Sequence, residues 1–191
     1  AAEEQGRRLA DRLLERSSVD GCDVVGIGVA SLWQIATALL LAQRVRQRRG
    51  PPVVLGGPFV SQHADLLMAQ HPFVDFAVVG EGEQPLLALL EQLRAGRRAD
   101  LAGVPSLWHR GDGAPRFNGR RCYAFENQTS PDFDGLPLHL YRRRSVLGHD
   151  LVLPYATIRG CRFRCSFCAH QELNGPTEHK SVDKVVRELG Q

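Results

Sequence analysis

Short apolar runs alternate with helix-like segments through the first half of the chain. Three runs rich in Val and Ile end in Gly or a small polar residue, at 23–31, 52–57 and 74–83. None of them alternates regularly between polar and apolar positions, which is typical of strands buried on both faces. The pattern therefore predicts three parallel strands of an open sheet.

The segments between these runs have helical spacing. Apolar residues recur from position 32 to position 45, arginines gather in the last turn, and Gly50 ends the predicted helix. Shorter helices are predicted at 61–71 and 84–96. Strand and helix in alternation predict a doubly wound, Rossmann-like α/β sheet. Three strands are few for such a sheet, so we expect more strands before Ala1 and a chain truncated at both ends.

The character of the sequence changes after residue 100. Two short apolar segments flank the turn signal Gly111-Asp112-Gly113, which predicts a hairpin. A stretch rich in Pro and turn formers follows and reads as a linker. A strand is then predicted at 150–160, and Ser181 is a plausible N-cap for a helix at 181–189. The expected organisation is an α/β domain over 1–100, a hairpin over 101–121, a linker over 122–149 and the start of a second domain over 150–191.

Composition narrows the class of protein. Hydrophobic residues make up 43% and charged residues 24% of the chain, which are ordinary globular values. The net charge of +3 is too balanced to indicate a nucleic-acid partner. The longest apolar stretch, 35–42, is far too short to span a membrane, and no leader peptide opens the chain. We therefore expect a cytoplasmic protein with no membrane partner.

Three cysteines lie within eight positions, as Cys161-x3-Cys165-x2-Cys168. Thiolates this close together can converge on one soft centre, either zinc or an iron–sulfur cluster. An odd, clustered set of cysteines also argues against a secreted disulfide scaffold.

The remaining candidate ligands favour iron–sulfur over zinc. A structural zinc site is closed by four ligands, and the chain has no second cysteine pair. Cys22 and Cys122 are remote in sequence, and His170 follows Cys168 so closely that it would strain the loop. A cubane cluster held by three cysteines instead leaves one iron open. Zinc and unrelated free cysteines remain the alternatives.

The cysteine loop, which follows Arg159-Gly160, resembles the cluster loop of radical S-adenosylmethionine (SAM) enzymes. The resemblance implies a [4Fe–4S] cluster on the three cysteines, with SAM chelated at the open iron and cleaved to a 5′-deoxyadenosyl radical. It also implies that Phe167, just before the last cysteine, packs beside the SAM adenine, although simple packing of the loop is the alternative. The predicted strand and helix around the loop would be the first unit of a (β/α) barrel.

The first half of the chain resembles the cobalamin (B12)-binding domain found upstream of that barrel in one subgroup. The resemblance lies in Gly56-Gly57-Pro58, in Gly80-Glu81-Gly82-Glu83 and in the run at 23–31. Ligands of open parallel sheets bind beyond the carboxyl ends of the strands. The residues that the resemblance implies for cobalamin contact are Ser31, Gly56, Gly57, Gly80 and Glu81. The alternatives are tight turns and a domain that has lost cobalamin, and the Asp-x-His-x-x-Gly signature of other cobalamin domains is absent.

Together the two resemblances imply a cobalamin-dependent radical SAM enzyme, most commonly a methyltransferase acting on an unactivated centre. An external flavodoxin- or ferredoxin-type electron donor is expected, and the substrate, a small molecule or a peptide, is not specified. The alternatives are a cyclase, a ring-contracting enzyme, a methylthiotransferase or a non-catalytic metal-binding module. A methylthiotransferase needs a second cysteine-ligated cluster, which Cys22 and Cys122 alone cannot hold.

Overall fold

The computed structural model describes residues 2–17, 19, 21–96, 101–141, 151, 153–163, 165–168 and 177–190. The chain forms two compact units, Ala1–Cys122 and Tyr123–Gln191. The first unit contains a five-stranded sheet and the second a two-stranded one. No helix in the described ranges is long and apolar enough to cross a membrane.

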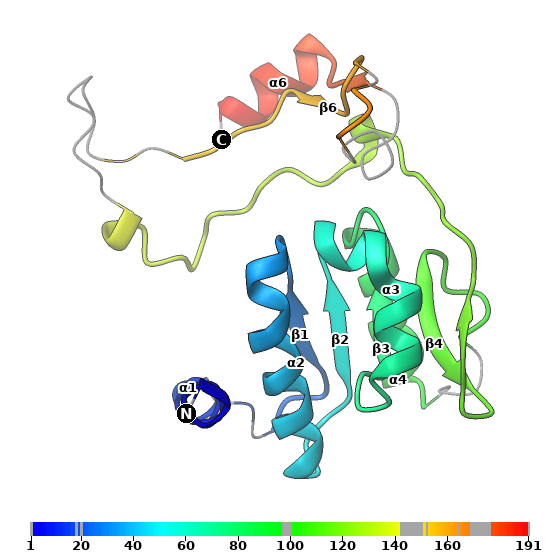
Figure 1. The fold of residues 1–191 in the computed structure, drawn as a ribbon. Helices are drawn as coiled ribbons and strands as arrows, with labels where there is room; N and C mark the ends of the chain where they lie inside the picture. The colour runs from blue at the N-terminus through cyan, green and yellow to red at the C-terminus, as the bar shows by residue number, and fades with distance from the viewer. Residues whose placement is uncertain are drawn as a thin grey trace. The chain divides into compact units, whose positions relative to one another are not determined.

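The sheet of the first unit begins with three parallel strands, as the sequence predicts (Figure 1). These are β1 (Val25–Gly28), β2 (Val53–Gly56) and β3 (Phe76–Val78), which lie side by side in chain order. Each is shorter than the apolar run that predicts it, because the flanking residues turn into the helices. The predicted α/β class with a mostly parallel sheet is confirmed.

The predicted hairpin is also present, and it extends the same sheet. β4 (Leu107–Gly111) pairs antiparallel with β3, and β5 (Ala114–Phe117) pairs antiparallel with β4. Asp112 and Gly113 both have positive φ, 46° and 86°, as a two-residue turn of a tightly twisted hairpin requires. The sequence predicts the hairpin but not its pairing with β3.

The described residues of this unit form four helices, of which α1 packs against α2. α3 begins three residues before its predicted start, because Pro58 is well suited to the first position of a helix. Ser31 and Gln34 form a capping box that begins α2 directly after β1. The helices are α1 (Ala2–Arg16), α2 (Leu32–Gln47), α3 (Pro58–Gln70) and α4 (Glu83–Arg94).

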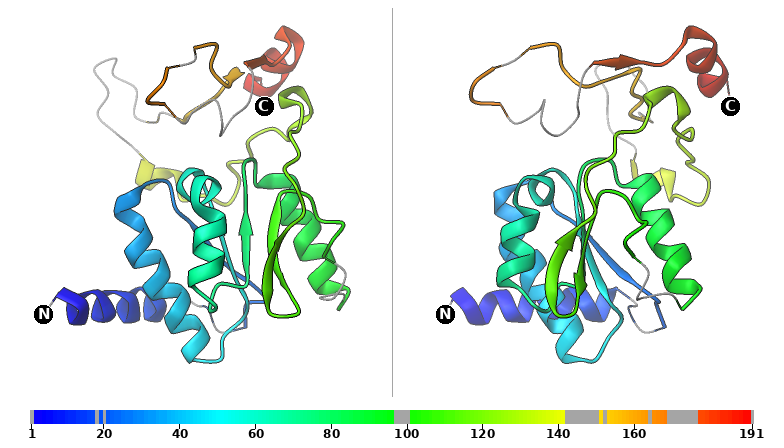
Figure 2. Two further views of the ribbon diagram at one scale, coloured as in Figure 1. Left: turned by 45° about the vertical axis from the view of Figure 1, so that its right-hand side comes forward. Right: turned by 90° about the vertical axis from the view of Figure 1, so that its right-hand side faces the viewer.

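The helices cover the two faces of the sheet unequally (Figure 2). α2 and α3 pack on the face that carries Ile27, Leu55 and Ala77, and form the larger core there. On the opposite face, Leu89 of α4 packs with Val54 of β2 and with residues of β3 and β4. No residue of β1 belongs to this smaller core, so α4 does not cover that strand there.

Arg110 on β4 fastens the end of α3 to the sheet. Its guanidinium donates hydrogen bonds to the carbonyl oxygens of Met68 (2.6 Å), His71 (2.9 Å) and Val74 (3.1 Å). The last carbonyls of a helix have no partners within the helix, so a cation with several donors is well placed here.

The second unit has less regular structure than the sequence predicts. A strand is expected over 150–160, but among the described residues of that segment only β6 (Ile158–Arg159) forms a strand, and it pairs antiparallel with β7 (Glu178–His179). Leu151 forms an isolated bridge. Pro154 has no N–H to donate to a ladder, which is one reason that 153–157 form no strand. The predicted final helix is present as α6 (Val182–Leu189), and the Ser181 side chain accepts a hydrogen bond from Lys184 N as its N-cap. The two short 3₁₀ helices are η1 (Phe125–Asn127) and η2 (Leu138–Tyr141).

Candidate functional site

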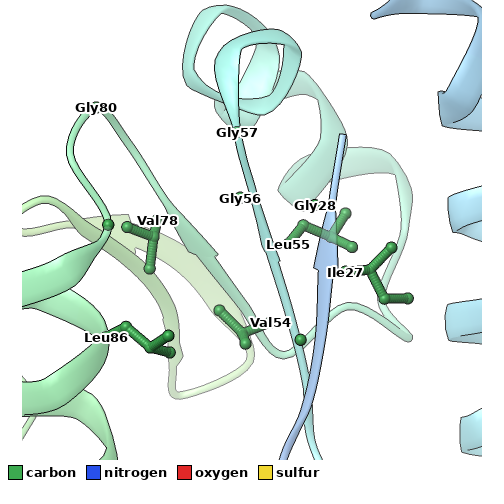
Figure 3. A pocket seen from close by; sticks show the side chains of 11 residues that line it. Ile27, Gly28, Val54, Leu55, Gly56, Gly57, Val78, Gly80 and Leu86 are labelled. Carbon is green, nitrogen blue, oxygen red and sulfur yellow. The ribbon is translucent and has the colours of Figure 1, made fainter. Parts of the chain in front are cut away.

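A cavity of about 340 Å³ opens on the less covered face of the sheet, between β1 and β2 on one side and α4 on the other (Figure 3). Val54, Val78 and Leu86 face this space, whereas Ile27 and Leu55 point toward the opposite core (Figure 3). The lining consists of glycines and aliphatic residues: Gly26, Ile27, Gly28, Val54, Leu55, Gly56, Gly57, Val78, Gly80, Gly82 and Leu86. Such a surface suits a flat apolar ligand group.

Glycines form the floor of the cavity. The parallel register places Gly28 beside Gly56 and Gly26 beside Val54. A β carbon built on Gly28 or Gly56 has no atom within 4 Å, and one on Gly26 lies 3.8 Å from Val54 Cγ1. The floor is thus open space that ordinary side chains would fill. Glycine inside a strand weakens it and often marks the close approach of a ligand.

Three of the five residues predicted at the strand ends line the cavity, namely Gly56, Gly57 and Gly80. Ser31 and Glu81 are not among the lining residues. Ser31 instead caps α2, and its backbone N–H donates to Gln34 Oε1 at 3.2 Å. Ligand contact by all five residues stays a prediction.

Gly57 has a structural reason to be glycine. Its φ is 101°, and a β carbon there would lie 2.6 Å from the carbonyl oxygen of Val29. That contact is too short for any side chain, because the strand ends of β1 and β2 meet at this point. The cavity wall at Gly57 is therefore fixed by backbone packing.

Ser61 joins the two glycine turns at the edge of the cavity. Its hydroxyl donates to the carbonyl oxygen of Gly57 at 3.0 Å and accepts the N–H of Gly80 at 2.8 Å. The turn after β2 is thus tied to the turn after β3 through one side chain. Sequence reasoning missed Ser61, since a serine on the first turns of a helix has no local signature for such a bridge.

Sequence reasoning also missed Gly26 and Gly28, which form half of the floor. Their signal is present in the run Val25-Gly26-Ile27-Gly28, where glycine alternates with β-branched residues. Alternate positions share one face of a strand, so such spacing indicates a bare face. Gly82 and Leu86 also lie in the lining. Gly82 belongs to the motif Gly80-Glu81-Gly82-Glu83 but was not predicted as a contact residue, and Leu86 carries no sequence signal.

The second unit presents the cysteine loop. Cys161 is half-buried, whereas Cys165 and Cys168 are exposed. The N–H of Cys168 donates to the carbonyl oxygen of Cys165 at 3.0 Å, so both lie on a single turn. Gly160 has a φ of 82° and lets the chain turn sharply out of β6. Phe167 is 90% exposed.

The three thiols share the loop without being drawn into one cluster. Within the part of the chain that the structure describes, no three His, Cys, Asp or Glu side chains are gathered closely enough to hold a metal ion. The donor set itself, three thiols on one short loop, has the chemistry that a soft iron centre requires.

A short antiparallel pair closes the base of this loop. β6 before the loop pairs with β7 after it, and the N–H of Lys180 donates to the carbonyl oxygen of Thr157 at 3.0 Å. The guanidinium of Arg159 lies 4.7 Å from the ring centre of buried Phe125. The residue two positions before the first cysteine is therefore anchored by the segment that precedes the loop.

A buried ion pair lies beside that base. Lys180 Nζ is 2.6 Å from Glu188 Oε2, and the two side chains are 4% and 2% exposed. The same carboxylate accepts hydrogen bonds from the Tyr155 hydroxyl at 2.5 Å and from Ser130 Oγ at 2.8 Å. Hydrogen bonds from Lys180 and then Tyr155 lower the pKa of Glu188 to about 2. Burial works to lower the pKa of Lys180, but its hydrogen bonds to Glu188 and Tyr155 raise it overall.

The first part of the chain matches a known family model, and most of its length is similar to curated methyltransferases. Residues 4–90 match the family model of the B12 binding domain. An uncharacterized methyltransferase of Pyrococcus horikoshii is 29% identical over 175 residues, which is 87% of this chain and 36% of that protein. The cobalamin-dependent radical SAM methyltransferase TokK of Streptomyces tokunonensis is 28% identical over 165 residues, 82% of this chain and 23% of TokK. This chain therefore spans only about a quarter to a third of the length of these relatives.

Solved structures share the fold. The radical S-adenosylmethionine methyltransferase TsrM of Kitasatospora setae, with cobalamin and a [4Fe–4S] cluster bound, matches with a TM-score of 0.64 at 21% identity. The match covers 95% of this chain and 37% of TsrM. The cobalamin-dependent S-adenosylmethionine radical enzyme OxsB matches with a TM-score of 0.66 at 18% identity, over 97% of this chain and 24% of OxsB.

Two glycine substitutions should distinguish a glycine that backbone packing requires from a glycine that forms the cavity floor. Gly57→Ala should lower the free energy of unfolding by about 2 kcal/mol or more, because the methyl group meets Val29 O and the φ is positive. Gly28→Ala should cost nothing and can raise stability by up to about 1 kcal/mol, since its methyl group enters open space. Urea unfolding of both variants checks this, and equal losses would contradict the assignment of Gly28 to the floor.

The buried ion pair predicts a pH dependence of stability. The folded pKa of Glu188 lies below its ordinary value of 4.5, so the contribution is complete above about pH 4.5 and is lost as the pH falls toward 2. Glu188→Gln should therefore be less stable than the wild type at pH 7, and this difference should shrink below pH 4.5. Urea unfolding between pH 7 and pH 2.5 measures it. Glu4→Gln, at an exposed pair with Arg8, is the control and should show a small, nearly constant difference.

Proposed function

Because the chain carries a B12 binding domain and is similar over most of its length to cobalamin-dependent radical SAM methyltransferases, we propose that it acts in an enzyme of that class. One observation carries the proposal: a glycine-floored cavity in the B12 domain is followed, in the same chain, by a three-cysteine loop. The reaction proposed is methyl transfer to an unactivated centre of a small molecule or peptide.

The cavity supports cobalamin as the first cofactor. Its volume suits a planar group rather than a whole corrinoid, so we assign it to the base at the end of the nucleotide tail. Gly26, Gly28 and Gly56 let that base approach the strands, and Val54 and Leu86 enclose it with apolar surface. Cobalamin bound in this way supplies the methyl group that is transferred.

The cysteine loop supports the second cofactor. Cys161, Cys165 and Cys168 would hold a [4Fe–4S] cluster, and their number would leave one iron for SAM. Such a cluster supplies the electron for reductive cleavage of SAM, drawn from a flavodoxin- or ferredoxin-type donor. Phe167, whose ring is almost fully exposed, is free of the protein core and suits a stacking role against the SAM adenine.

Filling the floor of the cavity with a side chain should weaken cobalamin binding. Gly28→Leu places an isobutyl group in the cavity and should weaken hydroxocobalamin binding by roughly tenfold or more, the effect of losing about 1.4 kcal/mol of apolar contact. Titration followed by the absorbance of the cobalamin measures the affinity. Gly103→Leu is the matched control, because a β carbon there also meets open space but lies outside the cavity. Wild-type protein that binds no cobalamin would refute the proposed cofactor.

Three of the five cysteines should be needed to hold iron, and the other two should not. After anaerobic reconstitution, the wild type should hold about four irons and four sulfides per chain. Alanine at any of Cys161, Cys165 or Cys168 should remove most of this iron, while Cys22→Ala and Cys122→Ala should not. Iron and sulfide analysis with EPR of the reduced protein gives the readout. Zinc bound without iron, or equal iron in all variants, would contradict the proposed cluster.

A further inference from the structure

The hairpin returns the chain to the edge of the sheet where the cavity opens. β4 runs antiparallel to β3, and β5 antiparallel to β4, so β5 runs in the direction of β3. The residues after β5 therefore emerge at the same edge as Gly80, which follows β3. Residues about 40 positions apart in sequence meet there.

Ser106 fixes this returning segment. It is fully buried, and its N–H donates to the carbonyl oxygen of Gly119 at 2.8 Å. Its hydroxyl accepts the N–H of Arg121 at 2.9 Å. Its own carbonyl oxygen accepts the N–H of Val79 at 2.9 Å. One residue thus holds the backbone on both sides of Arg120 and links it to the position just before Gly80.

The Arg120 side chain lies against Gly80. A β carbon built on Gly80 would be 3.3 Å from Arg120 Nε and 3.5 Å from Nη2. Gly80 lines the cavity, and its N–H is held by Ser61 Oγ at 2.8 Å. The guanidinium therefore lies at the rim of a cavity whose own lining residues carry no charge.

We propose that Arg120 binds the phosphodiester of the nucleotide tail whose base occupies the cavity. The proposal rests on the cobalamin assignment above and names a residue outside the 4–90 match. A guanidinium presents paired N–H donors that match two phosphate oxygens. A cavity lined by aliphatic residues suits the base, and a cation at its rim suits a phosphate. Together they favour a nucleotide tail that is apolar at its end and anionic where it is attached. Gly80 keeps the space that the guanidinium needs.

Three corrinoids that differ in the phosphate and the base distinguish the contact with each group. Cobinamide lacks the nucleotide, cobinamide phosphate carries a phosphate without the base, and hydroxocobalamin carries both. Absorbance titrations with each, on wild type and Arg120→Gln, test the phosphate contact alone. We expect Arg120→Gln to weaken hydroxocobalamin and cobinamide phosphate by about 10–100-fold, the range of charge-assisted hydrogen bonds, and to leave cobinamide unchanged.

Matched control variants show whether the effect of Arg120→Gln on binding comes from a general loss of structure. Arg116→Gln removes the same charge from an exposed β5 residue paired with Asp112 and should bind all three corrinoids as the wild type does. Arg120→Lys should recover part of the affinity, and the wild type should lose affinity for hydroxocobalamin with added salt more steeply than Arg120→Gln does.

The outcomes distinguish this inference from the function on which it rests. Wild type that binds hydroxocobalamin no more tightly than Arg120→Gln does would overturn the role of Arg120 and leave the cobalamin site intact. Equal weakening of cobinamide by Arg120→Gln would show a structural effect and would also overturn it. A wild type that binds no corrinoid would remove the cobalamin assignment, and the Arg120 contact with it.

Discussion

The parallel register between β1 and β2 is the constraint on which the site depends. It sets Gly28 beside Gly56 on one face and Ile27 beside Leu55 on the other. Because side chains alternate along a strand, a slip of one residue would turn large apolar groups into the cavity and bare glycines into the core. Burial of Ile27 and Leu55 against α2 and α3 therefore holds the register that keeps the cavity open. Core packing and ligand space follow from the same pairing.

Two serines extend this constraint to the edge of the sheet. Ser61 links the turns at Gly57 and Gly80, and Ser106 links the end of β3 to the segment that carries Arg120. Each hydroxyl both donates and accepts, so neither leaves an unpaired polar group in a partly buried place. The rim of the cavity is therefore fixed by the protein itself, which lowers the cost of ordering it around a ligand.

The local parts of this arrangement could be predicted from the sequence, and the non-local parts could not. Apolar runs and helical spacing indicate the three parallel strands and their helices, because those signals lie within a few residues. The pairing of β4 with β3, and the approach of Arg120 to Gly80, depend on where two antiparallel reversals return the chain. No residue near Gly80 signals that event. The glycines of β1 were visible in the sequence, but their role depends on which face α4 covers.

In the second unit, the two lysines have a distinct structural role. Lys180 and Lys184 are the only lysines in a chain whose other basic residues are arginines, and both donate to the network around Glu188 and η1. A lysine ammonium is a compact charge that can meet Glu188 and Tyr155 in a small buried space, where a planar guanidinium needs more room.

The same pair ties together residues on either side of the cysteine loop. Tyr155 precedes the three cysteines and Lys180 follows them, with a separation of 25 residues. Closing a loop of that length costs conformational entropy, and here the contacts of Glu188 with both residues offset part of it. A metal bound to the three thiols would then have less chain to order, so the buried ion pair would favour the proposed cluster.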